Sequence, residues 1–304
     1  MKDQGSINTI IREMQKVFLG QIDVVKYVLC TLLTGGHILI EGVPGVGKTL
    51  IGLTLSRLLN LSFRRIQFTN DMLPSDVIGF HMFRKGSIEP ELIKGPVFAS
   101  IVLADEINRT SPKTQSALLE AMQEGRVSID GITYPLSDPF MIIATQNPIE
   151  IAGTFPLPES QLDRFLIKTS VGYPPAQEEK EIILRDIDHT YALNLTHVMD
   201  REHIIKLKSY VSQVVVHQDV LDYIISVIRG TRAYPKIELG ASPRGGLALK
   251  RASQAWAFIH GRNYITPGDV TKMIFPVLSH RIITRGVDPV SVLEEIIDTI
   301  PVPV

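Results

Sequence analysis

Cysteine is almost missing from this sequence, because Cys30 is the only one among 304 residues. A framework of disulfide bonds is therefore excluded. Cys30 lies among apolar residues at helical spacing, a setting in which a buried core thiol is far more common than a reactive one. The eight histidines are scattered along the chain, and they form no cluster with the spacing of metal ligands.

Long hydrophobic runs and an excess of one charge are also missing. No segment approaches the ~18 to 20 uninterrupted apolar residues that a bilayer span requires, and the first six residues contain no apolar export signal. We therefore expect a cytoplasmic protein that does not insert into a membrane. The 31 basic and 32 acidic residues nearly balance, which argues against a surface built as a whole for nucleic acid but allows a local basic stripe.

The most specific motif is GVPGVGKT at residues 42–49, which fits G-x-x-x-x-G-K-[ST] at every fixed position. It follows an apolar run and precedes a helical pattern, as a phosphate-binding loop does. Glycines let backbone N–H groups close around phosphate oxygens, Lys48 can reach the terminal phosphates, and the Thr49 hydroxyl can ligate Mg²⁺. The predicted nucleotide-binding residues here are Gly42, Val43, Pro44, Gly45, Val46, Gly47, Lys48, Thr49 and Leu50.

The order of elements predicts an α/β fold followed by a helical part. Strand candidates alternate with segments that have room for helices, which implies a parallel sheet covered on both faces. Pro174-Pro175 disfavours continuation of helix or strand, so we predict domains at residues 1–174 and 175–304. The strand candidates are residues 37–41, 64–68, 101–104, 140–145 and 165–169, and the helix candidates of the second domain are residues 176–190, 201–212, 217–230, 244–260 and 267–278.

Two additional elements are predicted in the first domain. Between Thr69 and Val97 the apolar spacing loses any single period, and the turn signal at residues 84–87 indicates a projecting loop or hairpin at about residues 71–95. A second hairpin is predicted at residues 126–136, where alternating apolar residues flank Asp130-Gly131, a dipeptide suited to a two-residue turn. Three large apolar side chains of the first insert could either pack into the core or present a client-binding surface, namely Phe80, Met82 and Phe83.

Polar side chains follow two predicted central strands. Asp105 and Glu106 end one apolar strand, and the carboxyl ends of parallel strands face the ligand crevice. Asp105 can therefore approach the Mg²⁺ beside Thr49, directly or through water, while Glu106 polarises an attacking water. Asn147 follows another strand and is expected to orient that water. Taken alone, the acids could cap a helix or line a solvated edge, and Asn-Pro could simply start a turn.

Two arginines are candidates for contact with phosphate charge. Arg164 precedes the last predicted strand, where it is poorly placed for the phosphates of its own subunit and well placed for those of a neighbour. An arginine beside an aspartate is, by itself, more often a surface pair. Arg244 lies in the first turn of a predicted helix, where the helix dipole disfavours a cation, so it either tolerates that cost or is held there to meet an anion such as a γ-phosphate.

Together these motifs resemble those of AAA+ ATPases, and most closely the MoxR family. The resemblance extends from about residue 7 to 300, and the blocks around the acid pair and Arg164 make it highly specific. The segments that carry it are GVPGVGKT (42–49), QFTNDMLPSDVIG (67–79), GPVFASIVLADEINRTSPKTQSALLEAMQEGRVSIDG (95–131), ATQNP (144–148), FPLPESQLDRF (155–165) and SPR (242–244).

The resemblance implies a five-stranded ATPase core, a smaller helical lid and assembly into a ring, usually of six subunits. It implies ATP with Mg²⁺ as the bound nucleotide. It also implies chaperone-like work in the maturation of protein complexes, together with a client and a separate partner that carries a von Willebrand factor A domain. Residues 71–95 would be the helix-2 insert. By position, Lys48 and Thr49 would belong to Walker A, Asp105 and Glu106 to Walker B, Asn147 to sensor 1, Arg164 to the arginine finger and Arg244 to sensor 2. Arg244 would act either on the nucleotide of its own subunit or on that of a neighbour.

Other functions stay open at this point. A nucleic-acid translocase is the leading alternative, because related ATPases with the same insert act on DNA. The hairpin at residues 126–136 has only one basic residue, which is too few for a groove that tracks a phosphate backbone. A non-hydrolysing, nucleotide-gated scaffold is disfavoured by the intact set of predicted catalytic residues, and a metabolic phosphotransferase lacks an evident acceptor pocket.

Overall fold

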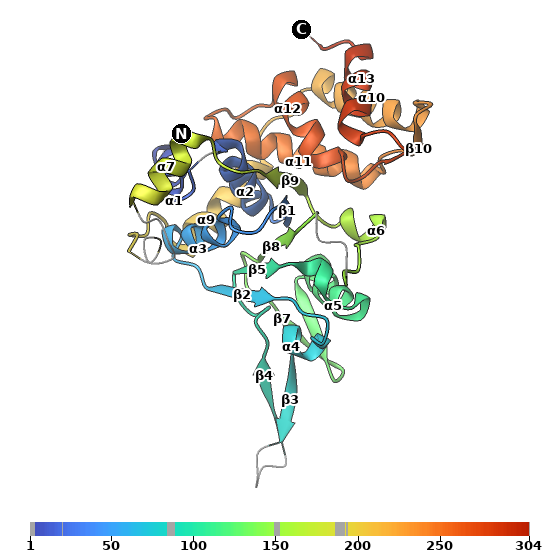
Figure 1. The fold of residues 1–304 in the computed structure, drawn as a ribbon. Coiled ribbons are helices and arrows are strands. Elements are labelled where there is room, and N and C mark those ends of the chain that lie inside the picture. Colours follow the sequence, from blue (N-terminus) through green and yellow to red (C-terminus); the bar gives the residue numbers. More distant parts are fainter. Residues whose placement is uncertain are drawn as a thin grey trace.

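The computed structural model describes residues 4–19, 21–83, 89–148, 153–185, 192 and 194–303. Its centre is a parallel five-stranded sheet in the order β2-β5-β8-β1-β9 (Figure 1). All five strand predictions are confirmed in type, although the last strand begins two residues later than expected because a turn carries Phe165 and Leu166 up to it. The strands are β1 (Ile38–Gly42), β2 (Phe63–Gln67), β5 (Ile101–Asp105), β8 (Met141–Gln146) and β9 (Ile167–Val171).

Alternation along the strands divides the core between two faces of the sheet. On one face Ile38, Ile40 and neighbouring side chains pack with the N-terminal helices and the C-terminal helices in one continuous cluster. On the other face Leu39 and its neighbours pack with α5. Both faces are covered, which explains why the central strands β1, β5 and β8 are nearly continuously apolar. The helices are α1 (Gln4–Val17), α2 (Ile22–Thr34) and α3 (Lys48–Leu58) on the first face and α5 (Pro112–Glu124) on the second.

The helix α5 and the following hairpin form as their local signals predict. The Ser111 hydroxyl accepts the N–H of Thr114, Pro112 takes the first helical position, and Gly125 ends the helix in the left-handed conformation. The hairpin turn has positive φ at both Asp130 and Gly131, as a two-residue I′ turn requires. Its strands are β6 (Arg126–Ile129) and β7 (Ile132–Pro135).

The insert is a short helix followed by an antiparallel ribbon. Figure 1 shows this ribbon projecting from the end of the molecule opposite the C-terminal helices. The predicted turn at residues 84–87 lies outside the described residues. The His81 ring contacts the Asp130 carboxylate at 2.8 Å and the Tyr134 hydroxyl at 2.9 Å, so it joins the ribbon to the β6–β7 hairpin. The elements are α4 (Pro74–Ile78), β3 (Gly79–Phe83) and β4 (Pro90–Lys94).

The three apolar side chains of the insert are exposed, with Phe83 the most exposed at 67%. The alternative that they pack into the core is therefore excluded. Whether they contact a client stays a prediction.

The C-terminal part is mostly helical, and the sequence reasoning missed two of its elements. A two-stranded ribbon joins residues 237–239 to 283–284, and strands this short leave no periodicity to detect. A last helix begins at Pro289 and is capped by Asp288, a signal that was present in the sequence. The elements are α7 (Ala176–Arg185), α9 (Arg201–Ser212), α10 (Gln218–Ala233), β10 (Ile237–Leu239), α11 (Pro243–Ile259), α12 (Pro267–Leu278), β11 (Ile283–Thr284) and α13 (Pro289–Thr299), and residues 186–190 of one predicted helix lie outside the described residues.

The helical part packs against the N-terminal helices. Trp256 of α11 is buried and its ring lies 5.6 Å from that of Tyr27 in α2, while Lys272 of α12 pairs with Asp23 at 2.6 Å. Trp256 and Phe258 are both core residues. The predicted boundary after residue 174 stays a prediction, because one hydrophobic cluster includes residues from both sides of it.

None of the described helices combines the length and the apolar character that a membrane span needs. Cys30 is fully buried and burial raises the pKa of its thiol, as expected for a core residue.

Candidate active site

The phosphate loop connects β1 to α3 in the predicted strand-loop-helix arrangement. Gly45 and Gly47 have φ values of 85° and 83°, a region that favours glycine. A side chain at Gly42 would come within 2.5 Å of the Val171 carbonyl oxygen in β9, so the close approach of the two strands requires glycine there. The loop thus leads into the N-terminus of α3 with its backbone in the conformation that an anion site needs.

Lys48 is buried and its Nζ donates a hydrogen bond to the Gly42 carbonyl at 2.5 Å. Burial lowers the pKa of this lysine, and the nearby carboxylates Asp105 and Glu106 oppose that shift. The amine therefore lies between the loop and the acid pair, where a bound phosphate would be a further partner for its charge.

An apolar pocket adjoins the loop, and sequence reasoning missed it. Side chains from the end of α1, the start of α3 and the segment after β9 line the pocket, together with the loop backbone. A mostly apolar cavity beside a phosphate loop suits a nucleotide base. No local pattern marks it, because its walls come from separated segments that include Ile182 of α7. The contributing apolar side chains are Val17, Phe18, Leu19, Val46, Leu50, Val171, Tyr173, Pro174 and Ile182.

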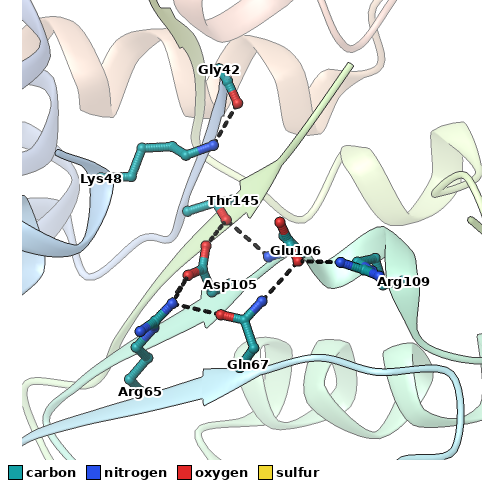
Figure 2. A network of polar contacts seen from close by, with 8 residues as sticks. All are labelled: Gly42, Lys48, Arg65, Gln67, Asp105, Glu106, Arg109 and Thr145. Atoms are coloured by element: carbon teal, nitrogen blue, oxygen red, sulfur yellow. Dashed lines mark hydrogen bonds and ion pairs between the residues drawn. The ribbon is translucent and has the colours of Figure 1, made fainter. Parts of the chain in front are cut away.

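The acid pair lies at the carboxyl end of β5 inside a network of hydrogen bonds (Figure 2). Asp105 is buried, and its Oδ1 accepts the Thr145 hydroxyl at 2.5 Å. Its Oδ2 accepts both Nη2 and Nε of Arg65, at 2.6 and 3.2 Å. The aspartate is thereby held from β8 on one side and from β2 on the other.

Glu106 adopts a left-handed conformation with φ of 56°, which turns the chain away from the strand. Its N–H donates to the Thr145 hydroxyl at 2.9 Å. Its Oε2 accepts Gln67 Nε2 at 2.8 Å and Arg109 at 3.1 Å (Figure 2). Two donors thus set the position of the carboxylate that we expect to polarise water.

Sequence reasoning missed Arg65, Gln67, Arg109 and Thr145. A signal was available for two of them, since Arg65 and Gln67 alternate on one face of a strand and Gln67 aligns with Asp105 in the parallel register. Recognising it required knowledge that β2 and β5 are neighbours. Asn147 is buried directly after β8, at the same edge of the sheet.

The residues present fit Mg²⁺ bound together with a nucleotide. Magnesium in such sites takes one or two protein oxygens and fills its remaining positions with phosphate oxygens and water. Thr49 and Asp105 supply a hydroxyl and a carboxylate of that kind. Within the described ranges, no group of three or more His, Cys, Asp or Glu side chains could by itself hold a metal ion. Phosphate oxygens and water would have to supply the other ligands.

The two candidate arginines lie at the other edge of the sheet. β1 and β9 are parallel, so the segment before β9 adjoins the start of β1, where the Leu166 N–H donates to the His37 carbonyl at 2.8 Å. The phosphate loop follows the end of β1, roughly 13 Å away at ~3.3 Å per residue. Arg164 and Arg244 line one pocket at this amino edge, together with Asp163, Arg251 and Arg281.

The contacts of these arginines contradict the alternative that Arg164 forms a surface ion pair with the aspartate beside it. Arg164 donates to the Leu119 carbonyl of α5 at 2.8 Å and does not pair with Asp163. The Asp163 carboxylate instead contacts Arg281 at 2.8 Å and Arg244 at 3.8 Å. The Ser242 hydroxyl caps α11 by accepting the Gly245 N–H, and the cap places Arg244 in the first helical turn beside this anion.

Comparisons with known proteins agree with this geometry. A family model described as the ATPase family associated with various cellular activities matches residues 37–167, and a model of the AAA lid domain matches residues 229–300. The chain is 39% identical to "Chaperone MoxR1" of Mycobacterium tuberculosis over 98% of this chain and 82% of that protein. The chain belongs to the MoxR family of AAA+ ATPases.

Other relatives of this MoxR-family chain are similar along nearly their whole length. An uncharacterised protein of Bacillus subtilis, YeaC, is 44% identical over 97% of this chain and 94% of its own. A crystal structure of a protein assigned as an ATPase, from Cytophaga hutchinsonii, superimposes with a TM-score of 0.92 at 37% identity, covering 100% of this chain and 96% of that one. The expected fold of AAA+ core and lid is thereby confirmed.

Proposed function

We propose that the protein hydrolyses ATP with Mg²⁺ at sites shared between neighbouring subunits of a ring, usually of six. The observation that carries this proposal is the separation of the two half-sites. The phosphate loop and the acids lie at the carboxyl edge of the sheet, whereas Arg164 and Arg244 lie at the amino edge. A head-to-tail contact between two copies brings opposite edges together, and repetition of that contact closes a ring.

Each residue then has a defined task. Lys48 and the loop backbone bind the phosphates, Thr49 and Asp105 hold the magnesium ion, and Glu106 accepts a proton from the attacking water while Asn147 orients it. Bound Mg²⁺ would neutralise phosphate charge during the transfer.

Arg164 of the adjacent subunit would stabilise the charge of the transition state. On this geometry Arg244 acts on the neighbour's nucleotide too, because it shares the amino-edge pocket with Arg164.

The energy would be used to remodel a protein client in the cytoplasm, with a separate von Willebrand factor A domain protein as partner. The name of the mycobacterial relative, a chaperone, supports this class of work. The projecting insert with exposed Phe80, Met82 and Phe83 supports it further, because exposed apolar groups of this kind are typical of protein-binding surfaces. A nucleic-acid translocase is disfavoured, since Arg126 is the only basic residue on the β6–β7 strands.

The test is ATP hydrolysis per chain as a function of protein concentration, without nucleic acid. For the wild type we expect the rate per chain to rise with concentration. For Arg164→Ala we expect a turnover lower by about 10³-fold at saturation with unchanged nucleotide affinity. Arg229→Ala, at an exposed position of α10, is the matched control and should behave as wild type. A flat concentration dependence with an active Arg164→Ala variant would refute the shared site.

A further inference from the structure

Arg281 follows the lid helix α12, and its side chain extends into the amino edge of the sheet. Only 2% of it is exposed. A guanidinium has five N–H donors, and each has an acceptor here. Nε donates to Asp163 Oδ1 at 2.8 Å, Nη2 to the carbonyls of Phe165 at 2.5 Å and Asp163 at 3.2 Å, and Nη1 to those of Leu166 at 3.1 Å and Val277.

A charge this deeply buried needs its partner. Burial lowers the pKa of Arg281 to about 10, and Asp163 opposes the shift. The guanidinium therefore remains charged at neutral pH, and Asp163 is the anion that balances it. Four of its acceptors lie on residues 163–166, and Nη1 also contacts His280 Nε2 at 2.8 Å. One lid side chain thus holds the segment that contains Arg164.

The same carboxylate also faces Arg244. Asp163 Oδ2 lies 3.8 Å from Arg244 Nη1, while Oδ1 binds Arg281. Asp163 thus links three arginines. Arg164 follows it in the chain, Arg244 lies in the first turn of α11, and Arg281 lies just after α12. Arg164 itself is steadied from the core side by the Leu119 carbonyl at 2.8 Å.

We propose that the Arg281–Asp163 pair is a positioning device for the arginine half-site. The pair fixes the position of Arg164 relative to Arg244 and couples both positions to the lid. Movement of the lid is thereby transmitted to the site of the adjacent subunit. This inference rests on the proposed shared site. Neither residue touches the nucleotide in this scheme, and both act through the two arginines.

The test uses Asp163→Asn, which keeps the shape of the side chain and removes its charge, and Arg281→Lys, which keeps the charge and loses the fork of donors. We expect turnover at saturating ATP to fall on the order of 10- to 100-fold, because a small misplacement of a positioned charge costs about that much. The affinity of each isolated chain for a fluorescent ATP analogue should stay unchanged, since the phosphate loop lies at the other edge.

A pair elsewhere in the lid supplies the matched control. Arg262 forms a forked ion pair with Asp269, whose side chain is only 4% exposed. Asp269→Asn should lower the melting temperature at least as much as Asp163→Asn does, because Asp269 is more buried and also accepts the Thr266 N–H. It should nevertheless keep wild-type turnover below that temperature. If Asp163→Asn also keeps wild-type turnover, or loses no more than Asp269→Asn, the proposal is overturned.

Mixed rings separate a defect of the arginine face from a general defect. Glu106→Gln has an intact arginine face, and Asp163→Asn has an intact phosphate loop and Glu106. An equimolar mixture should recover roughly a quarter of wild-type activity, because one interface in four then pairs the two intact halves. The same mixture made with Arg164→Ala is the reference. Recovery with Arg164→Ala but not with Asp163→Asn overturns only this inference, whereas recovery with neither overturns the shared site and this inference with it.

Discussion

The two edges of the central sheet differ in how their functional residues are assembled. At the carboxyl edge the phosphate loop is one contiguous stretch, and the acid pair directly ends a strand. At the amino edge the arginines come from a turn before β9, from α11 and from the segment after α12. A site built by one local segment can be recognised from the sequence. A site built by distant segments becomes visible only when the chain has folded.

The largest effect should come from the carboxyl edge. Glu106→Gln removes the proposed base and keeps a side chain of the same shape, so we expect turnover to fall by about 10² to 10⁴-fold while ATP still binds. Steady-state hydrolysis and equilibrium binding of a fluorescent nucleotide measure the two quantities. Glu294→Gln, at an exposed position of α13, is the control. A Glu106→Gln variant that still turns over at the wild-type rate would assign the base elsewhere.

Lowering the pH should destabilise the fold, because His37 at the amino edge of the sheet is buried in its neutral form. Its ring is buried, accepts the Ile142 N–H at 3.0 Å and contacts the Met122 carbonyl at 2.9 Å, and burial lowers its pKa to about 4. The unfolded chain, with a pKa near 6.5, binds the proton first. The stabilisation by neutral His37 is therefore complete above pH ~6.5 and is lost as the pH falls towards 4, by up to about 3 kcal/mol.

Denaturant unfolding of wild type and His37→Gln between pH 7 and 4 measures this contribution. The variant should lose less free energy of unfolding over that range, because it lacks the titrating ring. Both proteins will keep a further slope from buried His280, whose pKa is also lowered by burial. His203→Gln, at an exposed position, should match the wild type. Equal slopes for wild type and His37→Gln would show that His37 does not titrate in this way.

Arg244→Ala sharpens the contrast between the edges. If Arg244 acts on a neighbour's nucleotide, its removal should lower turnover of the assembled protein by about 10- to 100-fold. Nucleotide affinity of the dilute chain should stay unchanged, whereas Lys48→Ala should abolish it. A loss of affinity in dilute Arg244→Ala would instead place this arginine on its own subunit's nucleotide.

The smallest effect concerns Arg65, which shares Asp105 with the expected magnesium ion. Arg65 Nη2 lies 2.6 Å from Asp105 Oδ2 and is half exposed, so the pair is screened and its contribution is modest. Arg65→Ala should lower the Mg²⁺ concentration needed for half-maximal binding of a fluorescent nucleotide by about 2- to 5-fold, because one competitor for the carboxylate is removed.

Arg64→Ala is the matched control for that titration, since the neighbouring side chain lies on the other face of the strand. If Arg65→Ala raises the required Mg²⁺ concentration, Arg65 assists the site and does not compete for it.

The sequence alone determined the type of every strand in the sheet, the hairpin with its turn at Asp130 and Gly131, and the caps of α5 and α11. These features depend on neighbours along the chain: alternation, a proline at a first helical position, a glycine where φ is positive. Family membership followed from the same local blocks.

Tertiary structure decided which residues surround those motifs. Strand order placed Arg65 and Gln67 of β2 beside the acids of β5, and packing of α1 and the segment after β9 against the loop formed the apolar pocket. The lid brought Arg281 to Asp163 across 118 positions of sequence. No local pattern encodes such contacts, because they arise when separate apolar faces are buried together, and the polar groups carried along must then find partners in the folded chain.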